Sequence, residues 1–223
     1  MHSVEIRKVV NDTEKHATFR LRYEMYGKLG WIDQSHYSRG EEVDEYDELD
    51  TTSHFIALED GVAVGTIRLV GQSDLPFPMQ VPVDDGFSLP SLTDFGVESI
   101  SDVRASEVSR LMVQQNNGCP RHTLSLGLLQ VLCRETILRR YNFWLQALDA
   151  LTYRLMLSYN FALRKYASNK RFLGSLTVPT VMAVDWFFDN FKSVDRPMYD
   201  FFGKDIDPKD VVAEAAKTFN ARL

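Results

Sequence analysis

Apolar residues recur at helical spacing in several stretches of the chain. Phe19, Tyr23 and Tyr26 fall on one helical face after a capping oxygen at Asp12 or Thr13. Longer stretches with the same period follow in the second half, and a proline at an early helical position opens the last one. The pattern predicts four helices, at residues 12–30, 123–141 and 151–164 and from residue 207 onward.

Shorter apolar runs bounded by turn residues predict strands. Asp60-Gly61, between the first two runs, is typical of a tight hairpin. A polar segment over residues 34–52 and a proline-rich one over 75–101 predict irregular structure. The predicted strands cover residues 54–58, 63–70, 105–113 and 143–148, with closing strands within 172–184. This order predicts one α/β domain over residues 1–223, with a mostly antiparallel sheet flanked by helices.

Composition excludes several classes of protein. Hydrophobic residues make up 44% and charged residues 25% of the 223 positions, as in ordinary globular domains and unlike disordered or fibrous chains. No apolar run reaches membrane-spanning length, and the first ten residues lack a secretory apolar stretch, so we expect a cytoplasmic protein. Cys119 and Cys133 predict free thiols, and neither a disulfide framework nor a metal site is expected.

Charge is distributed unevenly along the chain. Residues 121–171 hold nine basic and two acidic side chains, a net charge of +7, whereas residues 1–120 carry −11 and residues 172–223 carry −2. A basic middle within an acidic chain suggests a positive face for an acidic partner, although ordinary solvated helix faces would give the same count. Nucleic acid is not expected as a partner, because the whole protein repels phosphate.

Arg68 and Arg110 each stand in an otherwise apolar predicted strand. A buried guanidinium is costly unless a carboxylate faces it. Asp44 and Asp47 in the polar loop and Glu107 in the strand offer such partners. We expect these five groups to hold the loop against the sheet and to line a cleft. Alternatively, Arg68 and Asp47 only pin the loop.

Glu107 is the candidate general base. A carboxylate among apolar strand residues has its pKa raised toward the range in which it accepts protons at neutral pH. Arg110 stands three positions later, so on a regular strand the two side chains would face opposite sides. A β-bulge would bring them together.

These residues form a pattern that resembles the acyl-homoserine-lactone (autoinducer) synthases and the N-acyl amino acid synthases. The pattern spans about residues 18 to 113, and its combined spacing is specific. It consists of Arg22-Tyr23, Tyr26 and Trp31, then Glu42-x-Asp44-x-x-Asp47, Gly65-x-x-Arg68 and Glu107-x-Ser109-Arg110. The resemblance implies a GNAT-like three-layer sandwich (α+β) and an acyl-carrier-protein-dependent N-acyltransferase.

The entry to the first hairpin bears on which branch is closer. Asp50-x-x-Ser53-His54 resembles the N-acyl amino acid synthases, whereas autoinducer synthases more usually have an aromatic residue where His54 stands. The proline-rich insert over residues 75–90 also departs from the autoinducer pattern. Alternatively, His54 is a polar residue at a strand edge without a role.

The resemblance also implies roles for individual residues. Glu107 would accept the proton of the attacking amine, with Arg110 setting its charge and position. Phe143, Leu145 and Met156 would line an acyl tunnel or, alternatively, belong to the plain core. The residues expected to order the closing loop or bind substrate are Arg22, Tyr26, Trp31, Asp44, Asp47, Arg68 and Ser109.

The segment over residues 113–123 bears on the acyl donor. It has one glycine and Pro120, which makes a weak cradle for the pyrophosphate of coenzyme A. We therefore expect no bound cofactor and a donor carried as acyl-phosphopantetheine on acyl carrier protein, which the resemblance implies is acidic. Residues 1–120 would carry the motif, and residues 121–223 would bind the acyl chain and the carrier protein. The expected docking residues, on two predicted helices, are Arg139, Arg140, Arg164 and Lys165.

The expected function is transfer of a fatty acyl chain from acyl carrier protein to the amine of an amino acid or a similar small acceptor. One alternative is autoinducer synthesis from S-adenosylmethionine, a quorum-sensing reaction in which lactone closure follows acylation. Another is a non-catalytic module that binds acyl carrier protein or lipid.

Overall fold

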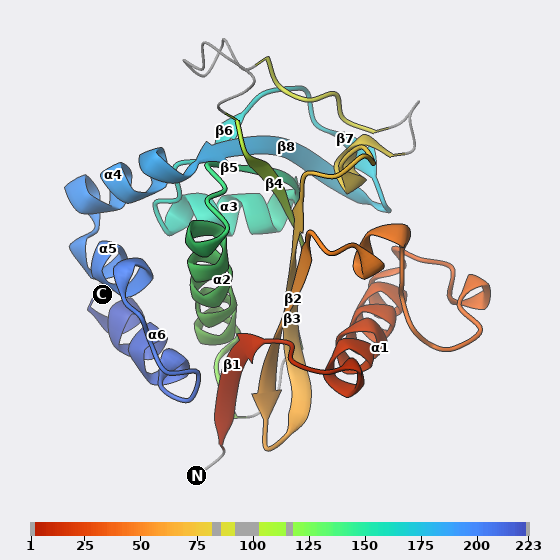
Figure 1. Ribbon diagram of the computed structural model, residues 1–223, viewed down its shortest axis with the longest axis horizontal. Coiled ribbons are helices and arrows are strands. Elements are labelled where there is room, and N and C mark those ends of the chain that lie inside the picture. Colours follow the sequence, from red (N-terminus) through yellow and green to blue (C-terminus); the bar gives the residue numbers. More distant parts are fainter. Residues whose placement is uncertain (1–2, 82–85, 92–102, 115–117, 222–223) are drawn as a thin grey trace.

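An eight-stranded sheet forms the centre of the computed structural model, which describes all residues except 1–2, 82–85, 92–102, 115–117 and 222–223 (Figure 1). The strands are β1 (Val4–Lys8), β2 (Thr52–Glu59), β3 (Val62–Gly71), β4 (Ala105–Val113), β5 (Phe143–Asp149), β6 (Arg164–Lys165), β7 (Lys170–Phe172) and β8 (Ser175–Ala183). Their order is β1-β2-β3-β4-β5-β8-β6, and β7 also pairs with β8. Among the described strands only β4 and β5 pair in parallel, which confirms the mostly antiparallel sheet.

Helices cover both faces of this sheet. The helices are α1 (Asp12–Leu29), α2 (Arg121–Leu138), α3 (Ala150–Ser158), α4 (Val184–Val194), α5 (Arg196–Gly203) and α6 (Val211–Asn220). Helix α1 lies on one side of the long β2–β3 strands and α2 on the other, with α5 and α6 outside α2 (Figure 1). The predicted three-layer arrangement is therefore confirmed.

Helix α1 has well-defined ends. The side chain of Asn11 accepts a hydrogen bond from the Glu14 backbone N–H and caps the first turn, one residue before the predicted cap. Gly30 ends the helix with a φ of 67°, a left-handed conformation that glycine adopts without a Cβ clash. These ends set the point at which the chain enters the polar loop.

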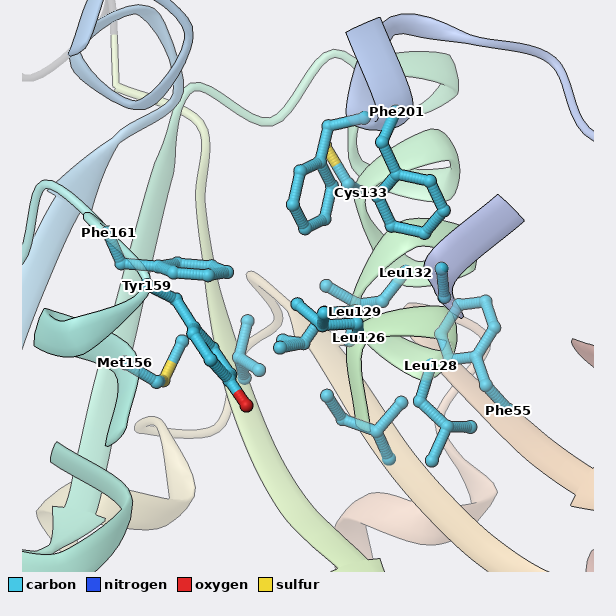
Figure 2. Packing of buried hydrophobic residues seen from close by; sticks show 14 of the residues in the cluster. Phe55, Leu126, Leu128, Leu129, Leu132, Cys133, Met156, Tyr159, Phe161 and Phe201 are labelled. Carbon is cyan, nitrogen blue, oxygen red and sulfur yellow. The ribbon is translucent and has the colours of Figure 1, made fainter. Parts of the chain in front are cut away.

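Two apolar clusters form the core. In the larger one, leucines of α2 meet Phe55 of β2, Phe201 of α5 and the segment around Tyr159 (Figure 2). The smaller cluster combines Phe143 and Leu145 with aromatic side chains from the proline-rich segment and from β7. Because Trp144 belongs to the larger cluster and its neighbours Phe143 and Leu145 to the smaller one, β5 separates the two.

Several elements differ from the prediction. Strand β1 was not predicted; only Ile6 of its five residues is fully buried, and its pairing with β2 defines it as a strand. Helix α3 ends at Ser158 rather than at residue 164, and α4 and α5 occupy residues 184–203, where no helix was expected. The last helix begins at Val211 rather than at residue 207. Buried apolar residues repeat at helical spacing in both helices, at Phe187 and Phe191 of α4 and at Met198 and Phe201 of α5, so this pattern was present in the sequence and the prediction missed it.

Candidate active site

A bulge in β4 places Arg110 on the same face of the sheet as Glu107. The pairing of β4 with β3 shifts by one residue between Thr66 and Arg68. Arg110 takes up the extra residue with a φ of 60°, a left-handed conformation that is uncommon for a residue with a Cβ. The β-bulge that was predicted from the spacing of Glu107 and Arg110 is therefore present.

Three arginines and three carboxylates form a closed ring on this face. Arg22 comes from α1, Arg68 from β3 and Arg110 from β4, and the carboxylates come from the polar loop. Each arginine contacts two carboxylates and each carboxylate contacts two arginines. The contacts are Arg22–Glu42 (2.5 Å), Glu42–Arg110 (2.9 Å), Arg110–Asp44 (2.8 Å), Asp44–Arg68 (2.6 Å), Arg68–Asp47 (2.7 Å) and Asp47–Arg22 (2.7 Å).

A short 3₁₀ turn, η2 (Glu45–Glu48), positions two of these carboxylates. The Asp44 side chain accepts from the Tyr46 N–H at 3.0 Å, and the Asp47 side chain accepts from the Asp44 N–H at 2.9 Å. This reciprocal capping explains the spacing of the two aspartates in the sequence. The same turn places the Tyr46 ring near Arg68, whose guanidinium carbon lies 6.0 Å from the ring centre.

Burial and the ring charges shift the pKa values of Asp47 and His54. Burial alone would raise the pKa of Asp47, but the hydrogen bonds from Arg22 and the charges of Arg68 and Arg22 hold it well below its usual range. Burial lowers the pKa of His54 to about 4 despite the nearby Asp47. His54 is therefore neutral at physiological pH, and its Nε2 lies 3.2 Å from the Asp47 carbonyl oxygen.

Four of the five residues that the sequence predicted as a network lie in the ring. Arg22 and Glu42 complete the ring. The side chains of Arg22 and Asp47 have no exposed surface. This geometry favours the alternative in which Arg68 and Asp47 pin the loop, with Arg22 added to them. A formally neutral ring of this kind leaves little free charge, so any substrate contact must use atoms outside these pairs.

Glu107 stands outside the ring, although the prediction placed it inside. One of its carboxylate oxygens accepts a hydrogen bond from the Met79 N–H at 2.8 Å. Burial raises the pKa of Glu107 to about 7, even though this hydrogen bond and the charges of Arg68 and Arg110 lower it. Arg110 thus affects the charge of Glu107, whereas the position of the carboxylate is set by Met79.

Glu107 is also the last residue of β4 that pairs with β5. The parallel ladder joins Ala105 to Phe143 and ends where Glu107 meets Leu145. Beyond this point β5 continues to pair with β8 and β4 continues to pair with β3, but the two strands no longer pair with each other. The carboxyl group with the raised pKa therefore lies where the sheet opens.

Two buried donors near Glu107 have no partner among the described residues. They are Nη2 of Arg68 and the hydroxyl of Tyr46. Arg68 donates through Nε to Ser109 at 3.3 Å, so Ser109, which was predicted to bind substrate, contacts an arginine of the ring. Tyr46 was not among the predicted site residues, and the only sequence signal for it is its position between Asp44 and Asp47.

Tyr26 and Trp31 lie beside the ring rather than within it. The Arg110 guanidinium carbon lies 5.6 Å from the centre of the Tyr26 ring, and the Tyr26 and Trp31 rings are 5.6 Å apart. Trp31 also packs against Gly174 in the turn between β7 and β8, where a Cβ would collide with it. The two aromatic residues thus connect α1 to the far end of the sheet.

The three residues proposed for the acyl tunnel lie in different clusters. Phe143 and Leu145 belong to the smaller cluster and Met156 to the larger one, across the sheet. They do not line one continuous wall. Phe143 and Leu145 adjoin the opening beside Glu107, because β5 pairs with β4 through these residues.

The expected docking residues do not lie on two helices. Arg139 caps α2 and lies 2.6 Å from Glu135, which also contacts Lys8. Arg140 follows it with a φ of 57°. Arg164 and Lys165 are exposed on strand β6 rather than on a helix, because α3 ends at Ser158. The helical prediction for this pair was wrong.

The segment before α2 presents an acidic side chain. Helix α2 begins at Arg121 after Pro120, which makes no side-chain cap. Glu59 packs closely against Gly118, where a Cβ would fall on its carboxylate. Part of the expected weak cradle, residues 115–117, lies outside the described residues.

Within the described part of the chain, no cluster of three or more histidine, cysteine, aspartate or glutamate side chains is arranged to hold a metal ion. In the same residues, none of the helices is both long and apolar enough to cross a membrane.

Comparison with known protein families gives a match over more than half of the chain. The model of the family described as N-acyl amino acid synthase FeeM matches residues 17–154, a range that contains the whole ring and Glu107. No curated protein sequence matches the chain.

Solved structures share the fold. FeeM, an N-acyl amino acid synthase from uncultured soil microbes, superposes with a TM-score of 0.63 at 13% identity, over 85% of this chain and 95% of that one. The coenzyme A-dependent acyl-homoserine lactone synthase BjaI gives 0.64 at 18% identity, over 97% and 100%. Aminoglycoside 6'-acetyltransferase type Ii gives 0.51 at 13% identity, over 80% and 96%. These similarities confirm the predicted acetyltransferase-like sandwich.

Proposed function

The chain belongs to the family of the N-acyl amino acid synthase FeeM, and on this premise we propose that Glu107 is the general base of an N-acyl transfer to an amino acid or a similar small amine. The reaction class is acyl transfer, as in the family. One observation carries the assignment of Glu107: a buried carboxyl group with a pKa of about 7 lies where β4 and β5 part.

The chemistry requires a base of this kind. The acceptor amine must lose a proton to attack the carbonyl carbon of the acyl thioester. The nitrogen forms a bond to that carbon, the carbon–sulfur bond breaks, and the thiolate takes up a proton to leave as a thiol. With a pKa of about 7, Glu107 is ionised in an appreciable fraction of molecules at neutral pH and accepts the amine proton directly or through water.

We further propose that the donor is an acyl-phosphopantetheine on acyl carrier protein. BjaI, which shares the fold, is described as dependent on coenzyme A, so the fold by itself does not select a carrier-bound donor. Two features of this chain support the carrier-bound donor. Glu59 lies against Gly118 beside the start of α2, and Arg164 and Lys165 are exposed at the sheet edge. The first repels a pyrophosphate and the second attracts an acidic carrier.

The ring of arginines and carboxylates has a supporting role in this proposal. It ties α1, the polar loop, β3 and β4 together around Glu107. In this role Arg22, Asp47 and Glu42 position the loop, while Arg68 and Arg110 also set the potential at Glu107. The acidic loop is thus held against the sheet without adding net charge to the site.

Mass spectrometry of the reaction products tests the proposal. Purified protein is incubated with an acyl carrier protein thioester and either a mixture of amino acids or S-adenosylmethionine. The proposal expects N-acyl amino acids. Acyl-homoserine lactones from S-adenosylmethionine would support the autoinducer reaction instead, and thioester that remains intact with every acceptor would support a non-catalytic binding module.

A further inference from the structure

A leucine stands at the tip of the β7–β8 hairpin, where tight turns favour asparagine or glycine. Phe172 pairs with Ser175, so Leu173 and Gly174 form a two-residue turn. Their φ values are 45° and 79°, and positive φ at both central positions is the mark of a type I′ turn. Leu173 is nevertheless 55% exposed and adds little to the core. A strained, exposed leucine that the fold does not need indicates a function.

Strand β8 carries a second exposed leucine on the side of the sheet that α3 covers. Leu176 is 52% exposed. Side chains alternate along β8, so Leu176 lies on the same side as Met182, which belongs to the larger core cluster. Helix α3 packs against β5 and β8 and supplies Met156 to that cluster, so it lies on this side too. The helix begins next to Leu176, because its N-cap Asp149 pairs with Thr177.

The outer surface of α3 adds two more leucines and an arginine. Leu151 is 76% exposed and Leu155 is 42% exposed, and one helical turn separates them. Arg154 is exposed beside them. Arg171 on β7 pairs with Leu176 and therefore points to the same side of the sheet. Neither arginine forms an ion pair within the described part of the chain.

These side chains form a surface that we call the leucine–arginine face. Its members are Leu151, Arg154, Leu155, Arg171, Leu173 and Leu176. The face lies in a stretch without negative charge: residues 150–176 contain five lysine or arginine residues and no aspartate or glutamate, in a chain with a net charge of −6. Exposed leucines among unneutralised basic side chains are typical of segments that lie on anionic membranes.

A bilayer surface matches both parts of this face. Its anionic headgroups attract the arginines, and its acyl chains take up leucines that project from a turn and from a helix, without a shape-matched pocket. A second copy of the chain fits less well, because a two-fold contact would bring the same basic side chains together. An acidic protein would satisfy the arginines but would need a separate pocket for the leucine at the tip.

We propose that the leucine–arginine face binds the surface of membranes that contain anionic phospholipids, with Leu173 at the hairpin tip entering the acyl region. The chain then lies on the membrane and does not span it. Gly174 of the same turn packs against Trp31, so the membrane contact adjoins the candidate active site. The inference goes beyond the proposed function and requires no acyl transfer.

Vesicle flotation tests the inference with the full chain and without donor or acceptor. Vesicles of phosphatidylglycerol and phosphatidylcholine in equal amounts are compared with vesicles of phosphatidylcholine alone, at low and at physiological salt. The main variant is Leu173→Asn, which suits the left-handed turn and should keep or raise the melting temperature. Leu155→Gln tests the helix with a residue of similar helix propensity. The control is Val62→Thr, because Val62 is 65% exposed beside the β2–β3 turn, elsewhere in the molecule (Figure 1).

The wild type should bind the anionic vesicles at least tenfold more tightly than the neutral ones, and less tightly as the salt concentration rises. Leu173→Asn should weaken binding about tenfold, because one leucine side chain no longer enters the acyl region. Leu155→Gln should weaken binding several-fold, and Val62→Thr should match the wild type. Arg154→Gln combined with Arg171→Gln should remove most of the preference for anionic lipid.

A wild type that does not bind vesicles would overturn the inference, and so would unchanged binding by Leu173→Asn. Titration with an acyl carrier protein and sedimentation equilibrium examine the other occupants. If Leu173→Asn loses carrier binding, or dissociates a dimer, while the wild type ignores vesicles, the face belongs to the carrier or to a second copy and the inference fails. Vesicle binding without any acyl transfer would contradict the proposed function alone.

Discussion

Glu107 and Arg110 stand three residues apart on β4, yet their side chains lie on the same face of the sheet because Arg110 adopts a φ of 60° in a bulge. The two side chains then have different surroundings. Arg110 closes a ring of ion pairs through Glu42 and Asp44, whereas Glu107 stays outside that ring and accepts from the Met79 N–H. The bulge thus places a guanidinium near the base without neutralising it.

Replacing Glu107 with glutamine should abolish most of the turnover. Loss of a general base typically costs 10²- to 10⁴-fold in rate. Because the ionised carboxylate is the base, the wild-type rate should rise as the pH increases through about 7, and the residual rate of Glu107→Gln should lack this rise. Initial rates with a carrier-bound donor between pH 5.5 and 9 measure both effects. A near-normal rate in a variant with an unchanged circular dichroism spectrum would contradict the assignment.

The same substitution should stabilise the protein at high pH. The folded-state pKa of Glu107, about 7, lies above the usual value of 4.5, so the folded state holds this proton more tightly than the unfolded state. As the pH rises from about 4.5 past 7, the wild type therefore loses stability, by about 3 kcal/mol for a shift of this size. Glu107→Gln cannot titrate. In urea unfolding its free energy of unfolding should exceed that of the wild type at pH 8.5 and approach it at pH 5, whereas an equal difference at both values would refute the shift.

Asp47→Asn should destabilise the fold strongly. It leaves Arg22 and Arg68 without a full counter-charge in the interior, a change that typically costs about 3–5 kcal/mol. The pKa of Asp47 is lowered on folding, so its contribution is present above the ordinary range for aspartate and is lost as the pH falls below it.

Glu48→Gln in the same turn is the matched control for Asp47→Asn. Its carboxylate pairs with Lys15 but is 70% exposed, so the change should cost less than about 1 kcal/mol. Denaturant unfolding at pH 7 compares the two variants. Similar losses in both would show that the turn, rather than the ring, carries the effect.

The donor preference should depend on Glu59. We expect a higher kcat/KM with acyl carrier protein thioesters than with acyl-coenzyme A of the same chain length. Glu59→Gln should improve the use of acyl-coenzyme A several-fold, because it removes a negative charge beside Gly118. It should leave activity with a short acyl-pantetheine unchanged, since that donor has no pyrophosphate. Equal efficiency of the wild type with the carrier-bound and coenzyme A donors would refute the carrier preference.

The proposed docking charges can be tested by reversal. Arg140→Glu and Lys165→Glu should weaken the use of the carrier-bound donor several-fold and leave a short acyl-pantetheine nearly unaffected. The deficit should shrink at high salt, because charges are screened over roughly 8 Å at physiological ionic strength. Arg139 is a poorer choice for reversal, since it already pairs with Glu135. A loss that is independent of salt and equal for both donors would rule out docking.

Much of the fold could be read along the chain. Periodicity located α1, α2 and the four central strands, because their apolar faces repeat within a single element and their ends carry turn residues. The candidate base, Arg68, Arg110 and two of the ring carboxylates were also recognisable, because charged residues stand out in apolar strands and in a dense acidic loop, whereas Arg22 was named only through the family resemblance. Helices α4 and α5 were missed although their buried aromatic residues repeat at helical spacing within each helix.

The sequence by itself determined which groups need partners, because burying a charge is costly wherever it happens. Only the tertiary structure decided how they are paired. The bulge turned Arg110 toward Glu42 and Asp44, Met79 took the place at Glu107 that the sequence assigned to Arg110, and α1 brought Arg22 into the ring. These pairings join residues up to 68 positions apart. The pairings are set by the strand register, by the left-handed conformation of Arg110 and by contacts between separate elements. No local sequence pattern encodes such long-range geometry.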